Sequence, residues 1–162
     1  MPTKKARVAA IQIDSQFGLV EANLGHAASM VQAAVQQGAE LVLLPELMPC
    51  GYHLTEEIWE YAEPAEGVTA GWLTSLTRSL DIYAGTSFLE VEGEDLYNTF
   101  ILATPQGKIA GKVRKCPPAS FEAYFYRAGS GSHVIETDLG RIGVGICYEN
   151  LLYDHLIEIR QA

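Results

Sequence analysis

Three side chains of the sequence, Glu46, Lys115 and Cys147, could act together in nucleophilic catalysis. Each follows a run that predicts a strand, and open α/β sheets gather functional residues at the carboxyl ends of their strands. A thiol needs a base to become a thiolate, and a neighbouring carboxylate can serve. A fixed cation and backbone N–H groups can stabilise the charge that develops on an attacked carbonyl or nitrile. The three residues therefore predict covalent catalysis at Cys147.

The stretch 143–150 (GVGICYEN) has the layout of a nucleophile on a sharp strand-to-helix turn, with a thiol in place of the usual hydroxyl. The match is imperfect, because Asn150 and Leu151 stand where a second glycine would be expected. Taken singly, each residue has a plainer interpretation: Cys147 as a buried structural thiol, Glu46 as a surface cap or ion pair, and Lys115 as a solvated charge. Only the combination favours catalysis.

A zinc site is the main alternative for the polar residues. Cys50 and His53 have the short spacing of a ligand pair, and His133 or Cys116 could be imagined to complete a site. Structural zinc sites usually contain two such pairs, and the sequence offers one, so we expect no metal. Tyr52 and His53 could instead contact a substrate, and simple packing explains them equally well.

The first half of the chain predicts a β-α-β unit. Residues 6–13 read as a buried first strand, residues 21–37 as an amphipathic helix with Gly38 at its C′ position, and residues 40–44 as a strand buried on both faces. Such a unit favours a parallel strand pair with a right-handed crossover. Next come a short helix over residues 55–61 with Thr55 as its cap, a helix over residues 69–80 and a strand over residues 82–91.

The second half predicts two antiparallel hairpins. The first joins residues 97–104 to 109–114, and the second joins residues 133–137 to 142–147. The long aromatic segment 115–132 between them lacks a periodic pattern, which is typical of a functional or mobile loop. A final helix capped by Asn150 would present an apolar face made of Leu152, Leu156 and Ile159.

Composition narrows the possible functions. The 162 residues are 48% hydrophobic and 19% charged, which predicts a globular domain with a core. The net charge of -9 argues against nucleic acid and anionic membranes as partners. No apolar run is long enough for a membrane span, and residues 1–5 lead toward a strand rather than a signal-peptide core. Three cysteines without a secretory signal indicate reduced thiols and a cytoplasmic location.

The motifs around the three residues resemble the nitrilase superfamily of carbon–nitrogen hydrolases. These motifs are LLPE at 43–46, GKVRK at 111–115 and GVGICYE at 143–149, in the order glutamate, lysine, cysteine. Asn98, followed by an apolar strand, also fits. The resemblance covers essentially the whole chain and implies an α-β-β-α four-layer sandwich, in which two facing sheets are covered by helices.

The resemblance also implies a mechanism for a small amide, carbamoyl or nitrile substrate. Glu46 would take the thiol proton and later activate water, and Cys147 would attack to give a thioester, or a thioimidate from a nitrile. Lys115 and the backbone N–H of Tyr148 would stabilise the tetrahedral intermediate. Glu122 is the candidate for a second glutamate that orients substrate or catalytic groups. The resemblance implies no metal or cofactor, and homo-oligomers are common in the family.

Members of that family are considerably longer than this chain. Residues 1–162 are therefore interpreted as the first part of a carbon–nitrogen hydrolase domain, so that the sandwich would be incomplete in this chain. We expect the 162 residues alone to be poorly soluble or inactive. An amide or carbamoyl hydrolase is the first hypothesis and a nitrilase the second. A truncated member that acts only by association with another chain is the alternative from a different class.

Overall fold

A computed structural model describes residues 5–161, and the expectations for residues 1–4 and 162 lie outside the described part. The elements in chain order are β1 Val8–Ala10, α1 Val20–Gln36, β2 Leu41–Leu43, the 3-10 helix η1 Glu56–Tyr61, α2 Val68–Leu80, β3 Tyr83–Glu92, β4 Asp95–Ala103, β5 Ile109–Arg114, η2 Ser120–Tyr124, β6 Val134–Thr137, β7 Gly140–Gly143, η3 Cys147–Leu151 and α3 Tyr153–Gln161. Within residues 5–161, no helix has the length and apolar character needed to cross a membrane.

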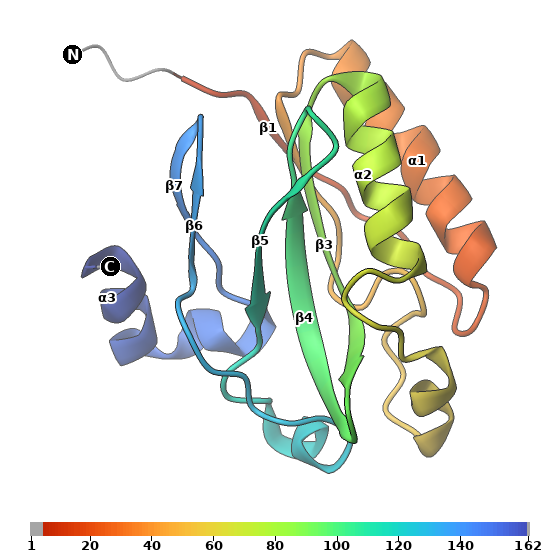
Figure 1. Cartoon of the computed structure of the whole chain (residues 1–162), viewed down its shortest axis with the longest axis vertical. Coiled ribbons are helices and arrows are strands. Elements are labelled where there is room, and N and C mark those ends of the chain that lie inside the picture. The colour runs from red at the N-terminus through yellow and green to blue at the C-terminus, as the bar shows by residue number, and fades with distance from the viewer. Residues whose placement is uncertain (1–4, 162) are drawn as a thin grey trace.

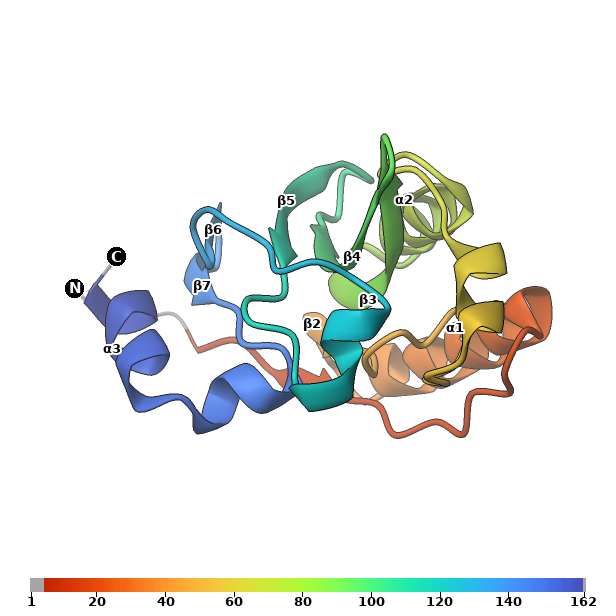
Figure 2. The ribbon, with the colours of Figure 1, turned by 90° about the horizontal axis from the view of Figure 1, so that it is seen from below.

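The elements stack in four layers. Helices α1 and α2 cover one face of a five-stranded sheet, the β6–β7 hairpin lies on its other side, and α3 lies beyond that hairpin (Figures 1 and 2). The sheet order is β1-β2-β3-β4-β5, with β1, β2 and β3 parallel and β4 and β5 antiparallel additions. The predicted α/β class, the β-α-β opening and both hairpins are confirmed.

Helix α1 ends as its sequence predicts. Gly38 adopts a φ of +87°, a left-handed conformation that costs glycine little. Its N–H donates to the Val35 carbonyl at 2.8 Å, and the Ala39 N–H donates to the Ala34 carbonyl at 3.1 Å. These two bonds are the Schellman pattern, which satisfies carbonyls at the end of the helix and turns the chain into β2.

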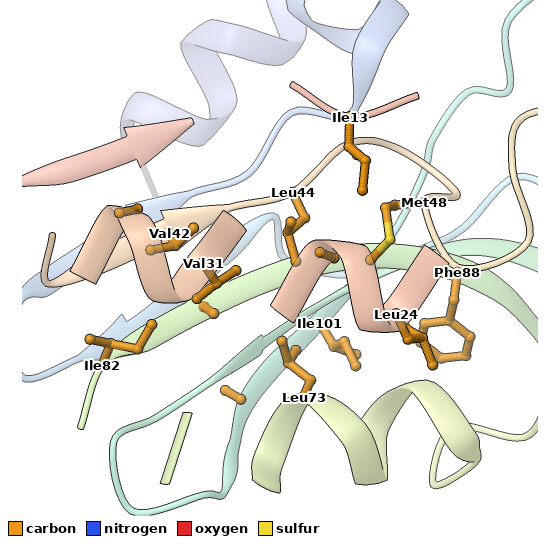
Figure 3. Packing of buried hydrophobic residues seen from close by; sticks show 14 of the residues in the cluster. Ile13, Leu24, Val31, Val42, Leu44, Met48, Leu73, Ile82, Phe88 and Ile101 are labelled. Atoms are coloured by element: carbon orange, nitrogen blue, oxygen red, sulfur yellow. The ribbon is translucent and has the colours of Figure 1, made fainter. Parts of the chain in front are cut away.

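The larger core fills the space between the helices and the five-stranded sheet. Leu24 and Val31 of α1 and Leu73 of α2 pack toward Val42 and Phe88 of the sheet layer, and all five side chains are buried (Figure 3). Burial of each such side chain contributes about 1.5–3 kcal/mol relative to exposure. This packing fixes the sheet whose strand ends carry Glu46 and Lys115.

A second, smaller core joins the two sheets. Leu102 and Val113 from the large sheet meet Ile135 and Val144 from the region of the second hairpin. Gly111 allows this approach, because a Cβ at that position would come within 3.0 Å of the Ile135 side chain. The close contact carries the segment after β7, and with it Cys147, against the strand ends of the large sheet.

Two expectations for the first half of the chain are wrong. The strand predicted over residues 6–13 is only β1, and Val8 is 54% exposed, because β1 is an edge strand paired with β2 alone. Thr55 does precede η1, but its hydroxyl makes no capping bond. The tight 3-10 turn uses the Thr55 carbonyl instead, which accepts the Ile58 N–H at 3.0 Å.

The end of the chain also differs from expectation. Strand β7 stops at Gly143, four residues before Cys147, and Asn150 lies inside η3 rather than at the start of a helix. The Asn150 side chain donates to the carbonyls of Gly145 and Cys147 at 2.9 and 3.2 Å, so it closes the turn that carries the thiol. No residue of α3 among those described is buried, so the predicted apolar face is only partly covered.

Candidate active site

Glu46, Lys115 and Cys147 are brought to one place from three separate segments. The Lys115 ammonium lies 2.7 Å from Glu46 Oε1, and the Lys115 side chain is completely buried. Glu46 and Cys147 line the same cleft between the two sheets. The three residues therefore lie together, although Cys147 belongs to η3 and not to the end of a strand. Their catalytic roles stay predictions.

The backbone after β2 turns sharply to hold Glu46. Leu47, the next residue, has a φ of +48° and donates its N–H to Ser87 Oγ at 2.8 Å. Asn98, which is fully buried in β4, donates from Nδ2 to Glu46 Oε1 at 2.6 Å. Sequence reasoning gave Asn98 no role in the site. The available signal was an amide inside an apolar strand, because a buried amide needs a hydrogen-bonding partner.

Lys115 is shared by two carboxylates. Its Nζ lies 2.8 Å from each oxygen of Glu122, in addition to its contact with Glu46. Burial favours neutral lysine, but the hydrogen bonds to Glu122 and Glu46 outweigh it and raise the pKa of Lys115 above its ordinary value. The site therefore holds a permanent positive charge.

Glu122, a candidate from the resemblance, is part of the same cluster. It lies in η2, is 1% exposed, and accepts the Ala119 N–H on Oε2 at 2.5 Å and the Tyr52 hydroxyl on Oε1 at 2.8 Å. Burial favours the protonated acid, but the hydrogen bonds, led by that from Lys115, hold the pKa of Glu122 below its usual value. Tyr52 is thus placed beside the site, with its side chain 49% exposed.

Cys147 is the first residue of η3 and has a φ of +52°. A non-glycine residue in this left-handed region costs of the order of 1–3 kcal/mol, and such strain is often found where a side chain must be presented. Burial and the nearby Glu46 carboxylate raise the pKa of the Cys147 thiol, against the opposing effects of Lys115 and the Tyr148 backbone N–H. The thiol is thus mainly protonated at neutral pH, and attack on a substrate requires a base.

Glu149 was named in the sequence only as part of the motif around Cys147. It is completely buried, and its carboxylate accepts two backbone N–H groups, from Cys116 and from Ile146, each at 2.5 Å. Cys116 follows Lys115, and Ile146 precedes Cys147. One carboxylate therefore ties the segment of the cation to the segment of the thiol. A glutamate two residues beyond the turn's first residue was the only signal in the sequence.

The cleft beside Cys147 has a volume of about 220 Å³. Its apolar walls come from both sheets and its polar groups from the ends of the strands. It is lined by Leu43, Leu44, Glu46, Ser87, Phe100 and residues 142–147. A small, mostly apolar hollow with a nucleophile and a carboxylate at one end suits a small organic molecule rather than a polymer.

Cys50 and His53, the short-spaced pair considered for zinc, are not assembled into a metal site. Cys50 is buried with Leu47 and Ile58, and burial raises the pKa of its thiol to about 11. The His53 ring packs 4.5 Å from that of Phe17. Within residues 5–161, no group of three or more potential ligands includes either Cys50 or His53. Cys50 therefore serves packing, and the exposed His53 ring contacts Phe17.

The fold and cluster match a known class of hydrolase. The family model described as carbon-nitrogen hydrolase matches residues 7–159, so the chain belongs to that family. The structure also superposes on Nit3 of Saccharomyces cerevisiae, a member of branch 10 of the nitrilase superfamily, with a TM-score of 0.83 and 28% identity over 96% of this chain and 60% of Nit3. The chain is therefore a nitrilase-superfamily member, as its motifs predicted.

Curated relatives carry several activities in their names. A nitrilase of Pyrococcus abyssi is 33% identical over 147 residues, which are 88% of this chain and 56% of the relative. A chloroplastic omega-amidase of Arabidopsis thaliana is 32% identical over 142 residues, 78% of this chain and 38% of the relative. The chain spans about half the length of the curated relatives it matches, so these names establish the hydrolase family and leave the substrate open.

Proposed function

We propose that this chain carries the nucleophile, base and cation of an enzyme that hydrolyses the C–N bond of a small amide or carbamoyl-amine substrate. The observation that supports this most directly is the fully buried Lys115 ammonium, which is shared between Glu122 and Glu46, because Glu46 also lines the cleft that holds Cys147. A fixed cation with no solvent contact is suited to stabilising negative charge on a substrate.

The reaction would begin with proton transfer from Cys147 Sγ to Glu46 as the sulfur attacks the carbonyl carbon. Lys115 and the Tyr148 backbone N–H would stabilise the oxyanion of the tetrahedral intermediate. Glu46 would return the proton to the departing nitrogen, so that ammonia or an amine leaves and a thioester remains. A water molecule, deprotonated by Glu46, would then attack the thioester and release the acid and the thiol.

Glu122 would act by fixing Lys115 and, with Tyr52, one wall of the site. Its carboxylate is held by the Ala119 N–H, the Tyr52 hydroxyl and Lys115, so it has little freedom to take a proton. We assign it a positioning role rather than that of the base.

A nitrile substrate is the second candidate, and the relative named nitrilase favours it. The same attack on a nitrile carbon gives a thioimidate, which loses ammonia on hydrolysis. Both substrates give the same acid and ammonia, so the two classes are distinguished by supplying the amide and the nitrile of one acid separately and measuring which is consumed. A small-molecule substrate, a homo-oligomeric assembly and a cytoplasmic location remain our proposals.

Intact-mass measurement of the chain after incubation with amides, nitriles and fluoroacetamide tests the proposal. Fluoroacetamide is a suitable probe because its acetamide moiety adds to the active-site cysteine of a mutant Nesterenkonia amidase of the same fold. We expect one covalent adduct, absent in Cys147→Ala and retained in Cys50→Ala, whose thiol is buried. If none of the tested compounds forms an adduct, the result would favour a member of the family that acts only by association with another chain.

A further inference from the structure

Three potential metal ligands converge beside the candidate active site, on the far side of η3. His133 precedes β6, Glu149 lies in η3 and His155 lies in α3, and one donor atom of each lies within 4.8 Å of the others. Glu149 Oε1 is 3.7 Å from His133 Nδ1 and 3.8 Å from His155 Nε2. The proposed reaction uses neither imidazole.

The Glu149 carboxylate lacks a permanent cationic partner. It is completely buried, and the only ion-pair partners found for it within the described residues are the two histidines. A buried carboxylate without a compensating charge is costly. The two imidazoles can compensate it either by taking up a proton or by holding a metal cation.

Within residues 5–161, His155 presents an unpartnered ring nitrogen to the cluster. Its Nε2 atom is buried and has no hydrogen-bond partner among the described residues. A neutral imidazole with its lone pair at the buried nitrogen is the form that binds a metal ion.

We propose that His133, Glu149 and His155 bind one divalent transition-metal ion, and that Zn²⁺ suits the site best. Two imidazoles and one carboxylate are a known zinc ligand set, with bond lengths of roughly 2.0–2.2 Å. Those bonds place neighbouring ligand atoms about 3.4 Å apart in a tetrahedral site. The distances of 3.7 and 3.8 Å from Glu149 therefore need to shorten by a few tenths of an ångström, and the two histidine nitrogens, which lie within 4.8 Å of each other, need to approach by up to about 1.4 Å.

The surroundings of the three ligands support the same assignment. The Val144 carbonyl lies 3.2 Å from His133 Nδ1, and binding of a metal ion at that nitrogen replaces this contact and leaves the ring N–H on Nε2. Backbone N–H groups of Cys116 and Ile146 hold the Glu149 carboxylate. Hydrogen bonds of this kind orient metal ligands in characterised sites. A hollow of about 340 Å³ lined by both histidines and Cys116 leaves room for a water molecule as the fourth ligand.

The proposed site has a consequence for the nucleophile. Glu149 holds the Ile146 N–H, and Ile146 immediately precedes Cys147. A metal bound to Glu149 would therefore stabilise the turn that presents the thiol without touching the substrate. Its expected role is structural, so metal binding is measurable without any turnover.

Titration of the metal-free chain with Zn²⁺ against a chromogenic chelator tests the proposal. We expect one tightly bound ion per chain and a higher melting temperature with the ion. His155→Ala and His133→Ala should each weaken binding at least tenfold, whereas His53→Ala, outside the cluster, should not change it. Co²⁺ in the same site should give the visible absorption of a tetrahedral ion.

The outcomes separate this proposal from that of the hydrolase. Stoichiometric binding that survives in Cys147→Ala and is lost in His155→Ala supports the site, whatever the activity. Absence of saturable binding, equal binding by both histidine variants and the wild type, or binding lost only with Cys147 would overturn it. Because no residue of α3 is buried, His155→Ala is expected to fold, and circular dichroism checks this.

Discussion

The two short 3-10 helices η2 and η3 have the same local design but opposite electrostatic surroundings. Each begins with a non-glycine residue of positive φ, Ser120 at +47° and Cys147 at +52°. Each has a fully buried glutamate at its third position, Glu122 or Glu149, whose Oε2 accepts the N–H of the residue before the helix at 2.5 Å. The backbone thus builds the same turn twice.

The difference lies at the other oxygen of each carboxylate. In η2, Glu122 Oε1 receives the Lys115 ammonium and the Tyr52 hydroxyl. In η3, Glu149 Oε1 accepts the Cys116 N–H as its one hydrogen bond from residues 5–161, and it faces two imidazoles. The Glu122 carboxylate is paired with the permanent charge of Lys115. The Glu149 carboxylate faces only groups that are not permanently charged among the described residues, the imidazoles of His133 and His155. The same turn therefore lies beside a permanent cation in one place and beside two imidazoles in the other.

Loss of the permanent charge should have the largest effect. Lys115→Met would leave Glu46 and Glu122 without their cation, and breaking a buried ion pair in this way typically costs about 3–5 kcal/mol. Urea unfolding followed by circular dichroism measures the change. Lys108→Met, at an exposed turn, is the matched control and should stay within about 0.5 kcal/mol. If Lys115→Met changed the free energy of unfolding by less than about 0.5 kcal/mol, the assignment of a charged ammonium paired with two carboxylates would be contradicted.

Neutralising each glutamate compares the two turns directly. Glu122→Gln weakens the pairing of a buried ammonium and should cost about 3 kcal/mol. Glu149→Gln keeps one oxygen acceptor for its two backbone N–H groups and should cost about 1–2 kcal/mol when measured with a chelator present. Added Zn²⁺ should increase the difference in unfolding free energy between the wild type and Glu149→Gln. Equal costs with the chelator would mean that the two carboxylates carry similar charge environments.

The pH dependence of Cys147 alkylation tests how Glu46 and Lys115 change the pKa of the thiol at the start of η3. Iodoacetamide reacts with the thiolate, so the rate rises through the thiol pKa. Since burial and Glu46 raise that pKa, the midpoint should lie above that of an ordinary thiol. Glu46→Gln should move the midpoint to lower pH, and Lys115→Met should move it to higher pH. Shifts in the opposite directions would contradict the proposed interaction of these groups.

The strand-end rule accounts for Glu46 and Lys115 but not for Cys147, which lies four residues beyond β7. Glu46 and Lys115 leave two strands of one sheet, so their convergence follows from the β-α-β and hairpin patterns alone. Cys147 comes from the second hairpin, and its place depends on the contact of Ile135 with Gly111, which no local pattern encodes. The resemblance of the motifs to a known family supplied that long-range information.

The failed expectations share a physical cause. Asn150 has the right chemistry for a helix cap, but its amide is used by the carbonyls of Gly145 and Cys147. The apolar β1 is exposed because it lies at the edge of the sheet. Glu149 was passed over because an acid after a cysteine gives no hint of the distant Cys116 N–H that it holds. Each outcome depends on contacts far apart in the sequence.

The smallest expected effect comes from relieving the strained residue of each turn. Glycine adopts positive φ at little cost, so Ser120→Gly and Cys147→Gly should each stabilise the fold by about 1 kcal/mol. Ser29→Gly, in the middle of α1, is the matched control and should destabilise it by roughly 0.5–1 kcal/mol. Chemical denaturation resolves differences of this size. If Ser120→Gly stabilises and Cys147→Gly does not, the thiol itself contributes to the stability of η3, and the two turns differ in more than their carboxylates.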